Sequence, residues 1–101
     1  MRVKQEMKYA IYSKYDPSER DEIMARARKV TEMIEKNPEK YPKEIFGPHS
    51  ISGGTSTIQI VEATEEQLMN SRHAWMPLQE LECVPLFDSR KLSELYPETI
   101  K

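Results

Sequence analysis

"TSTIQIVEATEEQLMNSRHAW", residues Thr55–Trp75, is the stretch that decides the fold. Its first part, Thr55–Ala63, alternates between apolar and polar residues, and this period of two predicts a strand. Thr64 and Gln67 follow in capping-box spacing, which predicts a helix beginning directly after the strand. Pro77 cannot continue that helix. The stretch therefore reads as a strand that runs straight into a helix of about three turns.

A strand and a longer helix are predicted at the amino-terminal end of the chain. Met7–Lys14, MKYAIYSK, is rich in aromatic and branched residues and carries apolar groups on both of its sides. Asp16 and Glu19 stand in capping-box spacing, and the helix that they start should end at Asn37, before a proline. The core stripe of this helix is predicted to be Ile23, Ala27, Val30 and Ile34.

Two further strands contain proline, which predicts edge positions or bulges. Glu44–Ile51 is interrupted by Gly47-Pro48 and should form a hairpin with Thr55–Ala63 around a glycine turn. Glu80–Phe87 is the fourth strand and contains Pro85. A short terminal helix follows, with one side predicted to consist of Leu92, Leu95 and Tyr96.

The order strand, helix, strand, strand, helix, strand predicts an α+β, ferredoxin-like βαββαβ domain over residues 1–101. Such a domain has a four-stranded antiparallel sheet with two helices on one face, here with a short C-terminal helix. Residues 1–6 are read as a frayed leader or a short extension of the first strand, and Met7 as an alternative start. Because the second sheet face also carries apolar residues, we expect a homodimer in which two sheets meet face to face.

Composition narrows the classes of partner and the compartment. The net charge of −2 and the scattered basic residues argue against a binder of nucleic acid. No apolar run approaches the roughly 20 residues that span a bilayer, so no membrane partner is expected. A single cysteine and the lack of a signal-peptide pattern predict a cytoplasmic protein.

The C-terminal half resembles a group of short uncharacterised domains in the dimeric α/β-barrel superfamily. The residues that carry the resemblance are the turn Gly53-Gly54, the strand Ile58–Ala63 ending in EA, Trp75, and Cys83–Phe87 with its VP pair. The resemblance implies a ferredoxin-like fold and a dimeric α/β barrel. Its wider relatives include cofactor-independent quinol monooxygenases, haem-degrading enzymes, chlorite dismutase-like proteins, lactone isomerases and stress-response proteins, so it leaves function open.

Haem-degrading relatives place a tryptophan in the cavity wall, with a histidine on the same helix and an asparagine on the first strand. Here Tyr12 or Ser13 stands where the amide would be needed, and His73 precedes Trp75 by two residues. This departure argues against haem chemistry, and no cofactor is expected.

His73 and Trp75 lie at opposite edges of the predicted helix's apolar arc, which contains Leu68, Met69 and Arg72. They are therefore close in sequence without sharing a site. Trp75 is interpreted as a core anchor. His73 is interpreted as a boundary residue, or alternatively as a base that titrates near neutral pH.

Three other residues are candidates for a ligand pocket between sheet and helices. By strict alternation His49 faces the same side as Gly47 and should border that pocket, although an exposed position or a contact across the dimer is the competing reading. Tyr12 could bond a ligand carbonyl or phenol, and Ile58 would supply an apolar wall. The predicted ligand-binding set is thus Tyr12, His49, Ile58, His73 and Trp75.

Cysteine and metal chemistry are disfavoured. Cys83 alternates with Leu81 and Pro85 in an apolar row, which is typical of an inert buried thiol. His49, His73 and Cys83 have no short ligand spacing, so no metal site is predicted.

Three functions remain open at this point. The leading hypothesis is a protein that binds or senses a small apolar or aromatic molecule. The second is a cofactor-independent monooxygenase or isomerase with His49 or His73 as catalytic base. The third is a structural or interaction module without a ligand.

Overall fold

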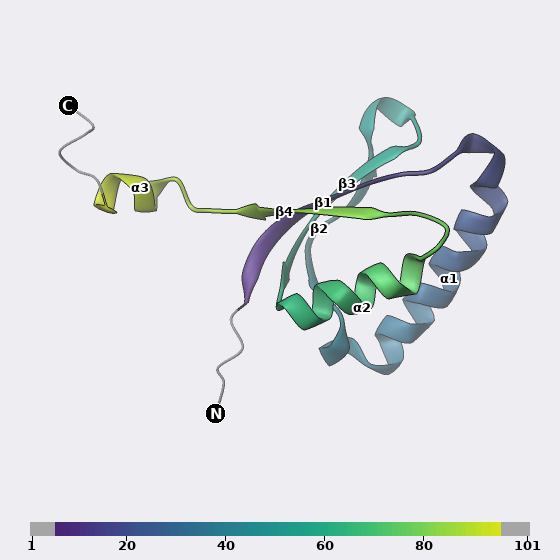
Figure 1. The fold of residues 1–101 in the computed structure, drawn as a ribbon, viewed down its shortest axis with the longest axis horizontal. Helices are drawn as coiled ribbons and strands as arrows, with labels where there is room; N and C mark the ends of the chain where they lie inside the picture. Colours follow the sequence, from purple (N-terminus) through teal and green to yellow (C-terminus); the bar gives the residue numbers. More distant parts are fainter. Residues whose placement is uncertain (1–5, 96–101) are drawn as a thin grey trace.

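The computed structural model describes residues 6–95 (Figure 1). Short 3-10 turns occupy Pro17–Glu19, Pro38–Lys40 and Ile51–Gly53. The strands and helices are β1 (Met7–Lys14), α1 (Arg20–Lys36), β2 (Lys43–Ser50), β3 (Ser56–Ala63), α2 (Glu65–Trp75), β4 (Leu81–Leu86) and α3 (Arg90–Leu95). The predictions made for residues 1–5 and for the side chains of Leu92 and Tyr96 fall outside the described part.

The four strands form one antiparallel sheet in the order β2-β3-β1-β4. The predicted α+β class, the four-stranded antiparallel sheet and the two helices are confirmed, and the strand order is compatible with a ferredoxin-like arrangement. Both α1 and α2 lie on the same side of the sheet (Figure 1). The two proline-containing strands, β2 and β4, form its edges, as expected from their missing backbone donors.

Local capping explains where the helices begin. The Asp16 side chain accepts a hydrogen bond from the backbone N–H of Ser18 and starts a 3-10 turn, so α1 begins at Arg20, later than the predicted capping box. Thr64 and Gln67 form the predicted capping box, with the Thr64 side chain accepting from the Gln67 N–H and the Gln67 side chain accepting from the Thr64 N–H.

The core lies between the sheet and α2. Ile11 is 2% exposed and packs with Val61, Leu81 and Leu68, which come from β3, β4 and α2. Trp75 and Cys83 are partly buried against this cluster, in line with their interpretation as core residues. On α1, Ile23 and Val30 are buried as predicted, whereas Ile34 is exposed. On α2, Met69 and Arg72 are exposed, so the buried arc is narrower than the sequence predicted.

Beyond β4 the chain leaves the body as an arm, residues 87–95, that carries α3 away from the sheet (Figure 1). Phe87 is 77% exposed and Leu95 is 68% exposed. The radius of gyration is 16.3 Å, above the roughly 13 Å of a compact chain of 100 residues. The arm therefore presents apolar side chains that its own chain leaves in solvent.

Candidate functional site

The sheet face opposite the helices, called the open face below, is covered by no element within residues 6–95. Its side chains form three rows across the sheet, because directly opposite residues of antiparallel strands point to the same face. In the order β2, β3, β1, β4 the lysine row is Lys43, Glu62, Lys8 and Leu86; the middle row is Phe46, Ile60, Ala10 and Val84; and the tyrosine row is His49, Ile58, Tyr12 and Glu82.

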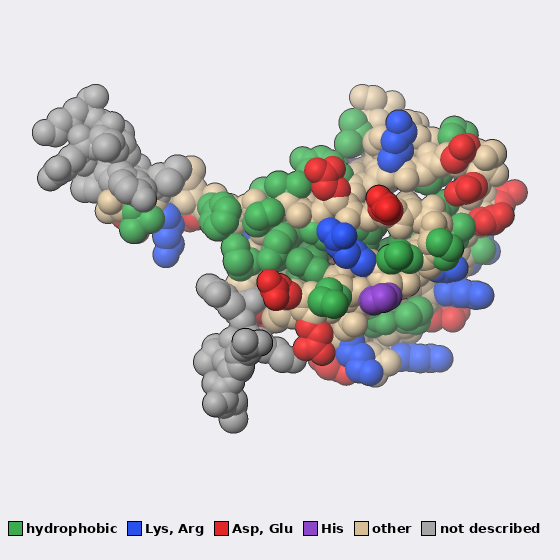
Figure 2. Space-filling view, in the orientation of Figure 1, with side chains coloured by type: hydrophobic (Ala, Val, Ile, Leu, Met, Phe, Trp, Pro, Cys, Tyr) green, Lys and Arg blue, Asp and Glu red, His purple; other side chains and the backbone are tan. Residues whose placement is uncertain are grey.

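The middle row is apolar from one edge of the sheet to the other. Phe46 is 43% exposed on β2, and Val84 is also exposed on β4. Figure 2 shows hydrophobic side chains gathered on the part of the body where β4 continues toward α3. The open face thus joins an apolar band to the apolar side chains of the arm.

His49 shares the open face with Phe46, and β2 is irregular between these two residues. The pairing of β2 with β3 shifts register between Glu44 and Phe46 and again between Phe46 and His49. Each shift adds one residue on β2 and reverses the side on which later residues point. The second shift therefore brings His49 to the side of Phe46, and the two shifts together leave it on the side of Lys43. The His49 ring therefore stacks on Phe46, with centroids 4.2 Å apart and planes within 8°. Its Nδ1 lies 2.7 Å from the carbonyl oxygen of Gly47.

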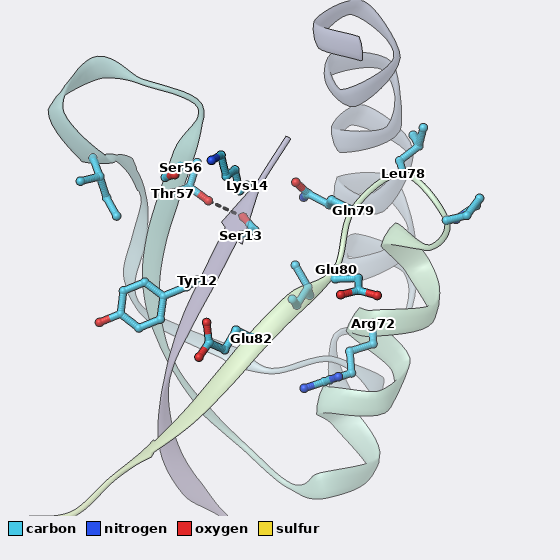
Figure 3. Close-up of a pocket in the computed structure, with 13 residues that line it drawn as sticks. Tyr12, Ser13, Lys14, Ser56, Thr57, Arg72, Leu78, Gln79, Glu80 and Glu82 are labelled. Carbon is cyan, nitrogen blue, oxygen red and sulfur yellow. Dashed lines mark hydrogen bonds between the residues drawn. The ribbon is translucent and has the colours of Figure 1, made fainter. Parts of the chain in front are cut away.

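A broad cleft of about 900 Å³ lies at the end of the sheet, where β1 and β4 separate (Figure 3). Its walls come from the end of β1, the start of β3, the Ile51–Gly53 turn, α2, and residues 77–82. The lining residues that carry polar or aromatic groups are Tyr12, Ser13, Lys14, Ser56, Thr57, Arg72, Gln79, Glu80 and Glu82.

The cleft carries opposite charges in equal number. Lys14 and Arg72 supply two cations, and Glu80 and Glu82 supply two carboxylates. Deeper in the strand region the hydroxyls of Ser13 and Thr57 hydrogen-bond each other, and Figure 3 shows this pair between the β1 and β3 backbones. The cleft can therefore present a donor and an acceptor to a small polar ligand, beside the Tyr12 ring.

The predicted ligand-binding residues do not line one pocket between sheet and helices. Tyr12 and Ile58 are direct cross-strand partners, and His49 is opposite Ile58, so all three lie on the open face. Trp75 packs against the core on the helix side. His73 is exposed on α2. Of the five, Tyr12 alone lines the cleft.

Sequence reasoning missed most of the cleft. Arg72 was assigned to the apolar arc of its helix, although an arginine in that arc could have signalled an exposed position. Residues 77–80 carry no periodic pattern, so nothing in the sequence indicated that they fold back beside β1. Ser13 lies near the end of β1 and Thr57 near the start of β3, and their pairing depends on strand register.

A contact from α1 fixes the C-terminal end of α2. The Arg26 guanidinium, from α1, donates to the carbonyl oxygens of Ala74 at 2.8 Å and Met76 at 3.1 Å. These carbonyls lie at the C-terminal end of α2, where the helix dipole favours a cation. The contact holds the start of residues 77–80, which connect α2 to β4 and form one wall of the cleft.

Among the described residues two exposed carboxyl groups, those of Asp16 and Asp88, have shifted pKa values, and both lie away from the cleft. The backbone N–H of Ser18, with its hydroxyl, lowers the pKa of the Asp16 carboxyl. The Arg90 guanidinium, which donates to Asp88 at 2.8 Å, lowers the pKa of that carboxyl. The Asp16 shift arises from a capping contact, and the Asp88 shift arises mainly from its ion pair with Arg90 at the start of α3.

The described part of the chain contains no group of three or more His, Cys, Asp or Glu side chains that could hold a metal ion. Within residues 6–95 no helix is both long and apolar enough to cross a membrane. Comparison with protein-family models, with curated proteins and with solved structures gave no match to this chain.

Proposed function

We propose that the protein is a homodimer that binds a small molecule in the cleft at the end of its sheet. The observation that carries this proposal is the position of Tyr12, which belongs both to the cleft lining and to the open face. A partner that covers the open face would therefore also close one side of the cleft. Burial of most of a ligand's surface is what small-molecule sites require.

The proposal includes a ferredoxin-like topology for the domain and a dimeric α/β barrel for the assembly. The strand order β2-β3-β1-β4, with both helices on one face, is the order of a ferredoxin-like domain. Sheet-to-sheet pairing of two such domains would give the dimeric α/β barrel that the sequence resembles. The apolar middle row, which is exposed at its two ends at Phe46 and Val84, supports this assembly, because apolar surface of this kind marks an interaction site.

The cleft suits a small molecule with an aromatic or apolar part and at least one polar group. Tyr12, Ile51 and Leu78 supply apolar surface, while the hydroxyl pair and the charged groups supply hydrogen bonds. A site with few polar groups on apolar walls can fix the orientation of a ligand. The ligand class proposed here is thus more polar than the sequence alone suggested.

Binding is favoured over histidine-based catalysis by the positions of the two histidines. A general base must come within hydrogen-bond distance of the proton that it removes. His49 lies on β2 and His73 on the exposed side of α2, and neither lines the cleft. An interaction module is the second candidate, favoured by the open face itself.

Native mass spectrometry of the protein purified from its source cells tests the proposal. We expect the mass of two chains together with a retained non-protein mass. The Arg72→Ala variant should lose the retained mass, because Arg72 is the cation on the α2 wall of the cleft. Arg28→Ala is the matched control, since Arg28 is an exposed arginine on α1 outside the cleft lining.

A dimer without retained mass would favour the interaction module. Equal retention by both arginine variants would place the ligand elsewhere.

A further inference from the structure

The four charged side chains of the cleft have no charged partner within residues 6–95. Lys14 and Arg72 form neither an ion pair nor a side-chain hydrogen bond with a described residue, and the same is true of Glu80 and Glu82. The guanidinium of Arg26 differs, because it is used inside the fold, where it donates to two backbone carbonyls. Unpaired charges of both signs that line one concave surface are available to a ligand.

The carboxylates and the cations of the cleft come from different walls. Glu82 lies on β4 opposite Tyr12, and Glu80 directly precedes β4. Lys14 is the last residue of β1, and Arg72 comes from α2. Figure 3 shows β4 between β1 and α2, with Arg72 extending from α2 toward β4. A ligand in the cleft therefore meets carboxylates on the β4 wall, one cation on the β1 wall and one on the α2 wall.

The separation of β1 from β4 leaves Glu80 without a cross-strand partner. The pairing of these strands ends at Ser13 opposite Leu81, so Lys14 and Glu80 are the next two residues in register. Unlike charges at directly opposite positions normally attract each other across a sheet. Here the two side chains form no ion pair, and both line the cleft. Glu80 is thus available to an ammonium group that a ligand supplies.

The balance of charges disfavours a ligand with a single charge. An anion that approaches Arg72 is repelled by the carboxylates of Glu80 and Glu82, and a cation at these carboxylates is repelled by Arg72. A zwitterion gains from both signs when its ammonium group lies at a carboxylate and its own carboxylate lies at the guanidinium. The planar fork of N–H donors on Arg72 suits the second role, because it can bind a carboxylate with two hydrogen bonds.

The apolar groups of the cleft indicate the rest of the ligand. Tyr12 is 38% exposed and Ile51 is 43% exposed, and Leu78 lies on the segment that connects α2 to β4. A tyrosine ring with a free surface attracts a second aromatic ring, in an offset or an edge-to-face arrangement. An α-amino acid carries its ammonium group, its carboxylate and its side chain on one carbon. An aromatic side chain on that carbon completes the match to the cleft.

We propose that the cleft binds an aromatic α-amino acid as the zwitterion, with its carboxylate on Arg72, its ammonium group on Glu80 and its ring against Tyr12. Lys14 and Glu82 balance each other in charge, so the occupied cleft stays neutral. This inference rests on the proposed binding of a small molecule in the cleft, and it names the class of that molecule.

Isothermal titration calorimetry with three probes of one carbon framework tests the ligand class. The full chain is dialysed until native mass spectrometry shows no retained ligand. L-Phenylalanine carries both charges, 3-phenylpropionate lacks the ammonium group, and 2-phenylethylamine lacks the carboxylate. We expect L-phenylalanine to bind roughly tenfold more tightly than either analogue, or better, because each analogue leaves one charged group of the cleft without a counter-charge.

Two variants assign the contacts. Glu80→Gln should lower the affinity for L-phenylalanine to that for 3-phenylpropionate, and it should not weaken the binding of 3-phenylpropionate. Arg72→Ala should lower the affinity for L-phenylalanine to that for 2-phenylethylamine. Glu35→Gln and Arg28→Ala are the matched controls and should change neither affinity, since both residues are exposed on α1 outside the cleft lining. Glu80 is chosen over Glu82 because Glu82 also belongs to the open face.

Equal affinities for the three probes would overturn the zwitterion class and leave binding in the cleft intact. Tighter binding of either analogue than of L-phenylalanine would overturn it in favour of a ligand with one charge. An affinity for L-phenylalanine that neither Glu80→Gln nor Arg72→Ala changes would place the amino acid outside the cleft. Failure of all three probes to bind would also overturn the inference, whereas the proposed function fails only if protein from the source cells retains no non-protein mass.

Discussion

Both faces of the sheet carry apolar side chains, but they differ in cover and in the number of charged residues. On the helix side Ile11, Val61 and Leu81 are almost fully buried beneath α2. On the open face Tyr12, Phe46 and Val84 stay in contact with solvent. Strand alternation thus gives both faces apolar side chains, whereas within residues 6–95 helices cover one of the two faces.

The largest effect on stability is expected on the face of the sheet that α2 covers. Leu68→Ala removes the α2 side chain from the core cluster and should lower the free energy of unfolding by about 2–5 kcal/mol. Denaturant unfolding followed by Trp75 fluorescence measures this, since Trp75 packs on the same cluster. Met69→Ala, 58% exposed on the same helix, is the control and should change stability by less than about 1 kcal/mol. Equal losses from both variants would contradict the assignment of the core.

The second-largest effect is expected on the open face and concerns dimer affinity. Ile60→Lys places an unpaired charge in the middle row and should weaken the dimer about 100-fold, because the ammonium group would be buried against apolar side chains. Sedimentation equilibrium measures the dissociation constant. Met24→Lys, at a site 53% exposed on α1, should leave it unchanged. An unchanged dissociation constant in Ile60→Lys would mean that the open face is not the contact.

A smaller effect is expected at the junction of β3 and α2. Thr64→Ala removes the side-chain acceptor of the capping box and should cost about 1 kcal/mol. Thr64→Ser keeps the hydroxyl and should recover most of that loss. Thermal unfolding by circular dichroism compares the three proteins. If the serine variant were as unstable as the alanine variant, packing of the threonine methyl group would be the cause instead.

The smallest effect is a pH dependence at the start of α1. The Ser18 contacts lower the folded-state pKa of Asp16 below its ordinary value of 3.8, so the contribution of this carboxylate to stability is present above pH 3.8. It is lost as the pH falls through the lower, folded-state pKa. The stability difference between the wild type and Asp16→Asn should therefore shrink in acid, as measured by unfolding at several pH values. A difference that grew in acid would have the wrong sign.

The sequence predicted the elements better than it predicted the site, and β2 shows why. Capping spacing at Thr64 and the proline positions depend on neighbouring residues, so they could be interpreted directly. An irregularity near Gly47-Pro48 was expected, and the pairing of β2 shifts there. Alternation alone does not say which face of a strand meets the helices, so His49 was left between a pocket position and an exposed one; in the structure it is exposed and opposite Ile58. Cleft residues such as Arg72 come together through the path of residues 77–80, which has no local sequence signal.

Residue-resolved hydroxyl-radical footprinting of the wild type against Ile60→Lys is the most direct test of the central claim, that a second copy covers the open face. In the wild type Tyr12, Phe46 and Leu86 should be protected, and in the variant they should be oxidised several-fold faster. Met24 and Met69 on the helices should react equally in both proteins. Protection of the helix surfaces, or equal oxidation of the open-face residues in the two proteins, would contradict the account.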